Sequence, residues 1–399
     1  MSLTRYYIVI LFVLLPVGDT FGALLPNSLL TLLRGSIFLL SLKFVIGFHN
    51  NYRSITTFML IYFSIRIILA IMVNITNLND LTNIIRLLYF PVIYTLLFTF
   101  NRILGLISNH KFTSTIALTN ILIIVSILSG YVSGTGGTIL GRGELFNGQK
   151  GYLIGANEVG LMLLLSSYTT FNLIKRKINN PILLILFICL NIWIGFIVFT
   201  KSSLVFSLFS FLYLFYFIYS SIKTKLLRST YLISITTLFI IKFSSSFSQL
   251  IQFGKKTFIN ELIEGNIASF LFRGRQHYIE AILPQLYNAK DNYLIFLFGA
   301  GETTTRELSV QPLGLTKGQG TTFEMDFFDL FALYGVIGLS LFVLWIFLLL
   351  KNNWNSIDSP TKWILFAVFT HAFLAGHVIF SPQVTTLISF LILSKNKPR

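Results

Sequence analysis

The sequence predicts an all-α protein that crosses a membrane many times, and its composition and its long apolar runs lead to this fold class. Apolar residues make up 54% of the 399 residues and charged residues 11%, with a mean hydropathy of +0.78. Soluble domains have roughly a quarter of their residues charged. Runs such as PILLILFICLNIWIGFIVF recur along the chain, and a spanning helix needs about 20 such residues. Residues 1–399 are therefore expected to form a single integral membrane domain.

The apolar runs divide into about twelve predicted transmembrane helices. They cover residues 6–22, 29–47, 55–73, 84–100, 114–132, 153–173, 181–199, 203–221, 229–244, 326–350, 362–377 and 380–394. The first run also has the look of a signal peptide. Because similar runs follow it throughout the chain, we interpret it as an uncleaved first span.

The cations predict the topology. Lys and Arg number 30 against 14 acids, and they gather on alternate connections, where the positive-inside rule places them. These connections hold Arg5, Arg53, Arg102, Lys111, residues 175–177, Lys223, Lys225, Arg228, Lys351, Lys362 and residues 394–399. Both termini are therefore predicted to be cytoplasmic. Since the charge excess follows the spans, it does not indicate a nucleic-acid partner.

One connection differs from the rest. Residues 245–325, between predicted spans 9 and 10, are mostly too polar to cross a membrane and form a large predicted extracytoplasmic loop. A second polar stretch on that side covers residues 133–151. Long loops of this kind are commonly functional. No internal repeat is visible, so the sequence does not support a transporter built from obvious repeats.

A basic segment lies inside the large loop. In LFRGRQHYIEAILPQL, Arg273 and Arg275 precede a helical pattern, which predicts an interfacial helix near 274–288. Its apolar face would carry Ile279, Ile282, Leu283 and Leu286. Arginine can bind phosphate or diphosphate with two parallel hydrogen bonds. Contact with lipid headgroups, or a salt bridge with Glu280, is the simpler alternative.

An acidic segment opens the tenth predicted span. TTFEMDFFDL carries Glu324, Asp326 and Asp329, and TTFE fits a capping box with Thr321 as the N-cap. Carboxylates are favoured at a helix N-terminus, which accounts for Glu324 and Asp326. Asp329 lies about one turn further in among phenylalanines, so it is expected to face a cavity or a cation.

Other motifs are weak. The three carboxylates could hold Mg²⁺ or Ca²⁺ through oxygen, but the five histidines show no zinc spacing. Gly299-Ala300-Gly301 could bring the backbone close to a ligand, although an ordinary turn explains it better. Cys189 lies in an apolar run and allows no internal disulfide.

In their order, these segments resemble the O-antigen polymerase and O-antigen ligase superfamily. The likeness covers roughly residues 140–390. It is carried by NGQKGYLIGANEVGLMLLL, FTKSSLVF, LFRGRQHYIEAI, FLFGAG, FEMDFFDLFALYGVIGL and AGHVIFSPQ.

The resemblance implies a glycosyltransferase of the bacterial cytoplasmic (inner) membrane. Such enzymes join undecaprenyl-diphosphate-linked glycans on the outer side of that membrane, by inverting transfer and without a metal or other cofactor. Donor and acceptor glycans and membrane lipid are the implied partners, with a chain-length regulator as a further candidate. The implied catalytic residues are Asp326, Glu324 and Arg275, and the implied substrate-binding residues are Arg273, Arg142, Lys201, Asp329 and His377.

Two departures from the family pattern favour a polymerase of O-antigen, capsule or exopolysaccharide over a ligase. Ligases carry a His-Asn pair where this chain has Glu324-Met325, and an arginine where it has Ser203. The general base is expected to be Asp326, with Glu324 as the close alternative and Asp329 supporting it. A flippase or transporter of lipid-linked glycan is the other alternative, because Arg34, Lys43 and Arg66 lie in or near early spans.

Overall fold

The computed structural model describes most of the chain. The described residues are 10–47, 53–72, 78–102, 105, 108–138, 149–153, 156–177, 180–198, 200–221, 275–288, 292–316, 320–376 and 378–395. They form helices, with one two-stranded antiparallel sheet.

The N-terminal part begins with a π-helical turn (Ile10–Leu14) and a 3-10 turn (Gly22–Leu24) on either side of α2 (Leu15–Thr20). Four long helices follow: α3 (Asn27–Gly47), α4 (Arg53–Met72), α5 (Leu78–Arg102) and α6 (Asn109–Ser133). The short hairpin of β1 (Gly137–Thr138) and β2 (Gln149–Gly151) leads to α7 (Ala156–Lys177), α8 (Pro181–Val198) and α9 (Lys201–Ser221).

The C-terminal part contains three short helices and three longer ones. They are α13 (Gln276–Asn288), α14 (Asn292–Phe298), α15 (Gly301–Val310), α16 (Asp326–Asn353), α17 (Ser359–Ala375) and α18 (Pro382–Lys395). The predicted interfacial helix near 274–288 thus corresponds to α13, although its position at a membrane surface stays a prediction.

The helices have the character of a membrane protein. By length and composition, five of them can cross a bilayer: α5, α6, α8, α9 and α16. Helices also occupy eleven of the twelve predicted spans, and the remaining one, 229–244, lies outside the described residues. The all-α membrane class is therefore supported, whereas the total of twelve spans stays a prediction.

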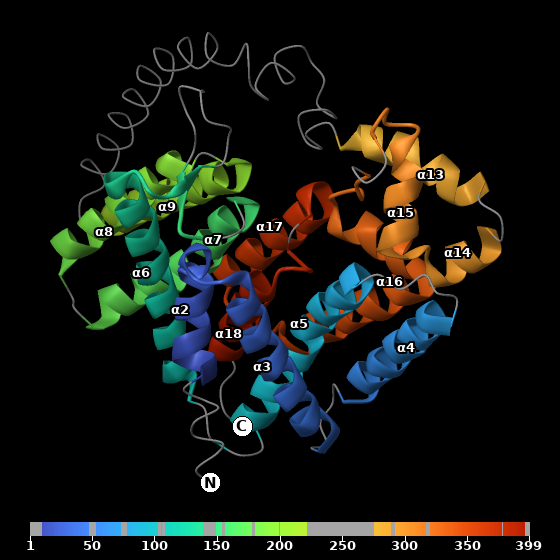
Figure 1. Ribbon diagram of the computed structural model, residues 1–399. Helices are drawn as coiled ribbons and strands as arrows, with labels where there is room; N and C mark the ends of the chain where they lie inside the picture. The colour runs from blue at the N-terminus through green and yellow to red at the C-terminus, as the bar shows by residue number, and fades with distance from the viewer. Residues whose placement is uncertain are drawn as a thin grey trace.

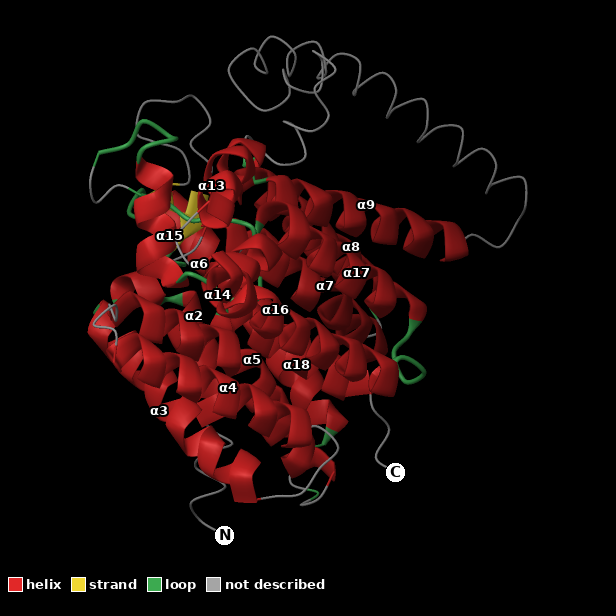
Figure 2. Cartoon of the chain, turned by 90° about the vertical axis from the view of Figure 1, so that its right-hand side faces the viewer, coloured by secondary structure: helices red, strands yellow, loops and turns green. Residues whose placement is uncertain are grey.

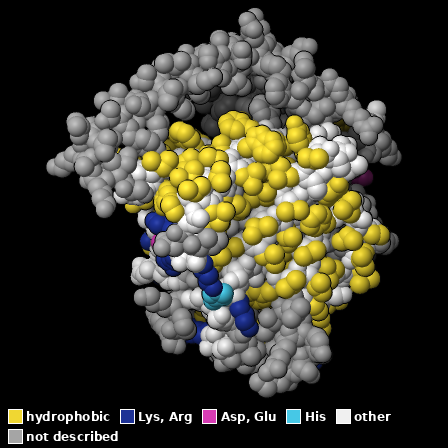
Figure 3. Space-filling view, turned by 90° about the vertical axis from the view of Figure 1, so that its left-hand side faces the viewer, with side chains coloured by type: hydrophobic (Ala, Val, Ile, Leu, Met, Phe, Trp, Pro, Cys, Tyr) yellow, Lys and Arg dark blue, Asp and Glu magenta, His cyan; other side chains and the backbone are white. Residues whose placement is uncertain are grey.

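The surface agrees with this class. Figure 3 shows the side of α6, α8 and α9, where hydrophobic side chains cover a broad face and cations gather toward one edge. Exposed hydrophobic residues of α8 and α9 include Ile182, Leu186, Trp193, Phe196, Leu208 and Leu212. An apolar area of this extent would be unusual on a soluble monomer and suits contact with lipid.

Helix α18 lies in the middle of the bundle and packs on α5, α6 and α7 (Figure 1). Its side chains from Pro382 to Leu393 are all buried. Helices α13, α14 and α15 gather beside α16 on the other side of the molecule from α8 and α9 (Figure 1). In the turned view, α13, α15 and the hairpin lie toward the same end of the bundle (Figure 2).

Helix α16 is broken at Gly335, and the break fits the turn between α14 and α15. Gly335 has φ 66° and ψ −174°, and Gly299 has φ 81°. A Cβ atom at Gly335 would lie 2.3 Å from the Leu297 backbone, and one at Gly299 would lie 2.3 Å from the Leu333 backbone. Both positions therefore require glycine, for conformation and for space. The Ala300 N–H also donates to the Ala332 carbonyl at 2.7 Å.

Candidate functional site

The basic and acidic segments meet at one ion pair. Arg275 immediately precedes α13, and its Nη2 and Nε lie 3.3 and 3.4 Å from Glu324 Oε2. The Arg275 side chain is 8% exposed and the Glu324 side chain is 41% exposed. The site therefore presents an accessible carboxylate against a buried guanidinium. Both distances are long for a charge-assisted hydrogen bond, so the pair is loose.

Glu324 has an unusual backbone. Its φ of 56° makes it the one non-glycine residue with positive φ among the described residues. This conformation costs about 1–2 kcal/mol for a residue with a Cβ, and it is enclosed by its surroundings: a Cβ at Gly376 would lie 2.4 Å from the Glu324 carbonyl oxygen. Strained positions of this kind concentrate at functional sites.

Asp326 lies two residues away, and one of its carboxylate oxygens is bound by the backbone. It is buried, and its Oδ2 accepts hydrogen bonds from the N–H groups of Val378 and Ile379, both at 2.8 Å. The carboxylate therefore fastens the segment after α17 to the first turn of α16.

Asp329 also binds backbone. It is buried, and its Oδ1 accepts from the Phe323 N–H at 2.8 Å. The expectation that this acid would face a cavity or a cation is wrong, because its Oδ1 is bound by an amide six residues earlier.

The capping-box prediction is wrong for the same reason. Helix α16 begins at Asp326, and its N-cap, Met325, makes no side-chain capping bond. Because Asp329 holds Phe323 in a turn back along the helix, residues 321–325 are not helical. The Thr321 N–H instead donates to Ser309 Oγ at 2.8 Å.

Helix α13 is positioned by its apolar face. Ile282 and Leu286 are buried in a cluster with Phe323, Met325 and Ala332, which brings Arg275 to Glu324. The alternative salt bridge between the basic segment and Glu280 is not formed by Arg275, because Glu280 pairs with His277 at 3.3 Å.

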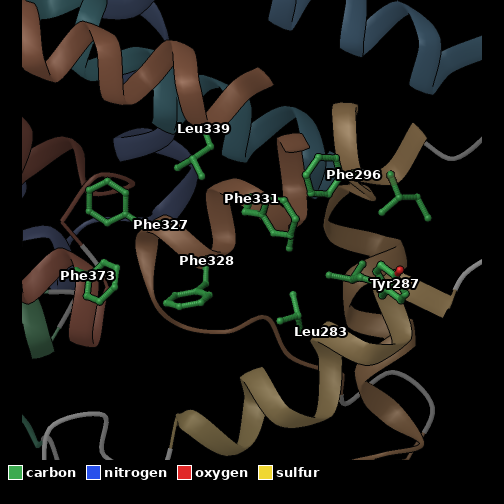
Figure 4. A pocket seen from close by; sticks show the side chains of 11 residues that line it. Leu283, Tyr287, Phe296, Phe327, Phe328, Phe331, Leu339 and Phe373 are labelled. Atoms are coloured by element: carbon green, nitrogen blue, oxygen red, sulfur yellow. The ribbon is translucent and has the colours of Figure 1, made fainter. Parts of the chain in front are cut away.

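An apolar groove of about 480 Å³ lies beside the ion pair. Figure 4 shows side chains from α13, α14, α16 and α17 converging on it. It is lined by Leu283, Leu286, Tyr287, Ile295, Phe296, Phe327, Phe328, Phe331, Ala332, Leu339 and Phe373. The ring of Phe328 in its wall packs against that of Phe323, the neighbour of Glu324, with ring centroids 5.9 Å apart and the planes tilted by 43°. The groove suits a hydrocarbon chain whose polar end lies at the ion pair, and we call it the outer groove.

Polar residues of α4 and α5 hold the turn between α14 and α15, the start of α15 and the break in α16. Arg66 of α4 donates to the Gly299 carbonyl at 2.8 Å, and Tyr62 donates to the Tyr334 carbonyl at 2.7 Å. From α5, Asn83 donates to Glu302 of α15 at 2.6 Å. Sequence reasoning noted Arg66 only as a charge in a predicted span and missed the other two.

The two other early cations differ from Arg66. Arg34 is bound to Asp19, with its Nη2 2.7 Å from Oδ1, and Lys43 is exposed. The Asp19 partner was missed, although an acid and an arginine in adjacent apolar segments are a usable signal for such a pair.

The described part of the structure does not place the remaining predicted site residues at the Arg275–Glu324 pair. Arg142, Arg273 and His377 lie outside the described residues, and Lys201 is the first residue of α9. Near it, Ser203 has a structural role: the Thr200 N–H donates to Ser203 Oγ at 2.7 Å, and the Ser203 N–H donates to Thr200 Oγ1 at 3.1 Å. Thr200 and Ser203 therefore form a reciprocal capping box at the start of α9.

No group of three or more His, Cys, Asp or Glu side chains that could hold a metal ion occurs in the part of the chain that the structure describes. Two of the three acids instead direct their oxygens to separate backbone amides.

Comparison of the chain with protein-family models, with curated proteins and with solved structures finds no match. The function is therefore inferred from the residues and from their geometry.

Proposed function

We propose that this protein is a membrane glycosyltransferase that polymerises undecaprenyl-diphosphate-linked oligosaccharide repeat units into O-antigen, capsule or exopolysaccharide. The observation that carries the proposal is the Arg275–Glu324 pair together with the outer groove, whose wall residue Phe328 contacts Phe323, the neighbour of Glu324. A lipid-linked glycan has three parts that suit this site. Its long hydrocarbon suits the groove, its diphosphate suits Arg275, and its sugar would lie near Glu324.

The pair can supply both halves of an inverting transfer. The acceptor hydroxyl oxygen attacks the anomeric carbon, while the bond from that carbon to the diphosphate oxygen breaks and its electrons leave with the diphosphate. A carboxylate takes the hydroxyl proton, which is general-base catalysis worth about 10²–10⁴-fold. A guanidinium stabilises the leaving charge, an effect worth about 10²–10³-fold for a single well-placed donor.

Among the acids, the geometry favours Glu324 as the base. Its carboxylate is accessible and held only by the loose contact with Arg275, whereas Asp326 and Asp329 are buried and bound to backbone. When a diphosphate replaces Glu324 as the partner of Arg275, the carboxylate becomes free to accept the proton.

The contacts of Arg34 and Arg66 argue against the flippase alternative. A path for a charged substrate needs cations that are available to it, but Arg34 is paired with Asp19 and Arg66 is bound to a loop carbonyl. Both arginines thus have a structural explanation, which leaves the exposed Lys43 as the one candidate cation of the three with no contact described here. The ligase alternative lacks its His-Asn pair, as Glu324 and Met325 occupy those positions.

A deletion strain separates the three functions. Loss of a polymerase leaves surface lipid with a single repeat unit and no ladder of longer chains. Loss of a ligase leaves long chains on the carrier lipid, and loss of a flippase leaves single repeats on the cytoplasmic side. An unchanged glycan ladder in the deletion strain would refute the proposed function.

A reconstituted assay tests the chemistry directly. The purified protein in vesicles with a synthetic lipid-diphosphate repeat unit is expected to make oligomers and to release polyprenyl diphosphate in equal number to the bonds formed. Glu324→Gln is the matched inactive variant. Activity that EDTA abolishes and Mg²⁺ restores would contradict the two-residue mechanism.

A further inference from the structure

A second groove runs between α16 and α17, from Phe327 to Trp354 and Lys362. It has a volume of about 250 Å³, and we call it the inner groove. It is lined by Phe327, Val343, Ile346, Leu350, Trp354, Lys362, Leu365, Phe366 and Phe369. Lys362 is the one charged residue in this lining. Phe327 also lines the outer groove, so this side chain stands between the two.

The part of the inner groove from Val343 to Trp354 matches one leaflet in length. Val343 and Trp354 are eleven residues apart along α16 and its C-cap, which corresponds to about 16 Å of helix at 1.5 Å per residue. Half of the ~30 Å hydrocarbon core of a bilayer is about 15 Å. The groove is therefore long enough for one acyl chain of one leaflet.

The end of the groove is cationic and aromatic. Lys362 Nζ lies 4.7 Å from the centroid of the Trp354 ring, a cation–π contact, and Trp354 is exposed. Exposed Lys351 lies in the last turn of α16. Tryptophan and lysine at the end of a spanning helix are typical of the headgroup level, so the apolar groove ends where headgroups lie.

The charge of Lys362 is available to a ligand. Among the described residues, no carboxylate forms an ion pair with Lys362. The nearest acid in the sequence, Asp358, is bound by Lys395 at 2.8 Å. Lys351 and Lys362 thus give this end of the groove a net positive charge.

We propose that the inner groove binds the acyl chain of an anionic phospholipid, with the lipid phosphate on Lys362. The site lies on the predicted cytoplasmic side, separate from the Arg275–Glu324 pair, and the proposal does not depend on glycosyl transfer. Any apolar groove that faces lipid would be filled by hydrocarbon. The specific part of the proposal is that the cationic end of the groove selects an anionic headgroup.

The test uses Trp354 as the reporter. The full-length protein with Trp193→Phe and Trp363→Phe is reconstituted in phosphatidylcholine vesicles, leaving Trp354 and the buried Trp345. Brominated phosphatidylglycerol or brominated phosphatidylcholine is then titrated, and quenching of the exposed tryptophan is measured. A single lysine near a headgroup is worth about fivefold in affinity for an anionic lipid, so phosphatidylglycerol is expected to quench at about fivefold lower mole fraction.

Matched variants make the outcome specific. Lys362→Gln is expected to remove the preference, Lys362→Arg to keep it, and Lys111→Gln, which changes an exposed lysine of α6, to leave it unchanged. Equal quenching by the two lipids, or a preference that survives Lys362→Gln, would overturn the proposal. Relief of quenching by added polyprenyl phosphate would assign the groove to an isoprenoid chain instead. Quenching that changes with the protein-to-lipid ratio but not with the lipid headgroup would assign it to a second copy of the chain.

Discussion

The roles of Glu324 and Asp326 can be separated by exchanging each acid for its amide. Glu324→Gln and Asp326→Asn change one atom each, two residues apart in the chain. If Glu324 is the base, Glu324→Gln is inactive and stable, and Asp326→Asn keeps activity because its carbonyl oxygen can still accept from Val378 and Ile379. If Asp326 is the base, the activities are reversed.

The expected magnitudes follow from the contacts. Glu324 is 41% exposed in a pair at 3.3 Å, so its loss costs at most about 1 kcal/mol of stability, while loss of a general base lowers the rate about 10²–10⁴-fold. Asp326→Ala differs, because it leaves two buried N–H groups unpaired at about 1–3 kcal/mol each. The free energy of unfolding should fall by about 2–6 kcal/mol.

Two measurements decide between the roles. The glycan ladder of a complemented deletion strain, normalised to protein level, reports activity, and tryptophan fluorescence during heating in detergent reports the Tm. We expect no ladder and a nearly unchanged Tm for Glu324→Gln, a ladder for Asp326→Asn, and a clearly lowered Tm for Asp326→Ala. A stable but inactive Asp326→Asn together with an active Glu324→Gln would refute the assignment.

Three further predictions test other contacts. Arg275→Lys keeps the charge but loses the two-pronged guanidinium, so polymerisation should fall about 100-fold at normal protein level; a full-length ladder would reduce Arg275 to a headgroup contact. Gly335→Ala and Gly314→Ala both place an alanine in a backbone conformation with positive φ. A Cβ at position 335 would lie 2.3 Å from backbone, whereas one at position 314 would have nothing within 4 Å. Gly335→Ala should therefore be less stable than Gly314→Ala by about 1–3 kcal/mol in detergent unfolding, and equal stabilities would show that the helix break adapts. Burial raises the pKa of Asp358, but hydrogen bonds from Lys395 and Thr361 outweigh it and hold this pKa below its usual value. The stabilisation is present above the unfolded pKa of about 3.9 and is lost as the pH falls through the lower folded pKa. Asp358→Asn should then flatten the fall of Tm below about pH 4, and an unchanged pH profile would contradict this.

The apolar runs were sufficient to predict the helices, because hydropathy alone decides which segments can lie in lipid. The boundaries at the polar ends were less predictable. TTFE satisfied a local capping pattern, yet the helix begins at Asp326 because Asp329 binds the Phe323 amide instead. A capping motif indicates only which hydrogen bonds are available within the first turn, and a hydrogen bond to a residue outside that turn can form instead.

The contact between Arg275 and Glu324 was predictable because their charges are opposite. Which of the three acids is accessible and which are bound by backbone amides was not predictable. The partners of Asp326 are amides 52 and 53 residues later, and every residue except proline carries such an amide, so no side-chain pattern marks them. The fit of Gly299 against Gly335 is similar: each glycine was visible in the sequence, but their contact was not.

The break at Gly335 connects the fold to the proposed chemistry. An unbroken helix of 28 residues would be about 42 Å long, well beyond the ~30 Å hydrocarbon core. Residues 336–353 alone give about 27 Å, which is close to that thickness without the first nine residues. Those nine are thus free to turn aside and to present Phe327, Phe328 and Phe331 to the outer groove. Because Glu324 directly precedes this segment, the same break that ends the span also sets a carboxylate at the edge of an apolar groove, where a lipid-linked substrate would place its diphosphate.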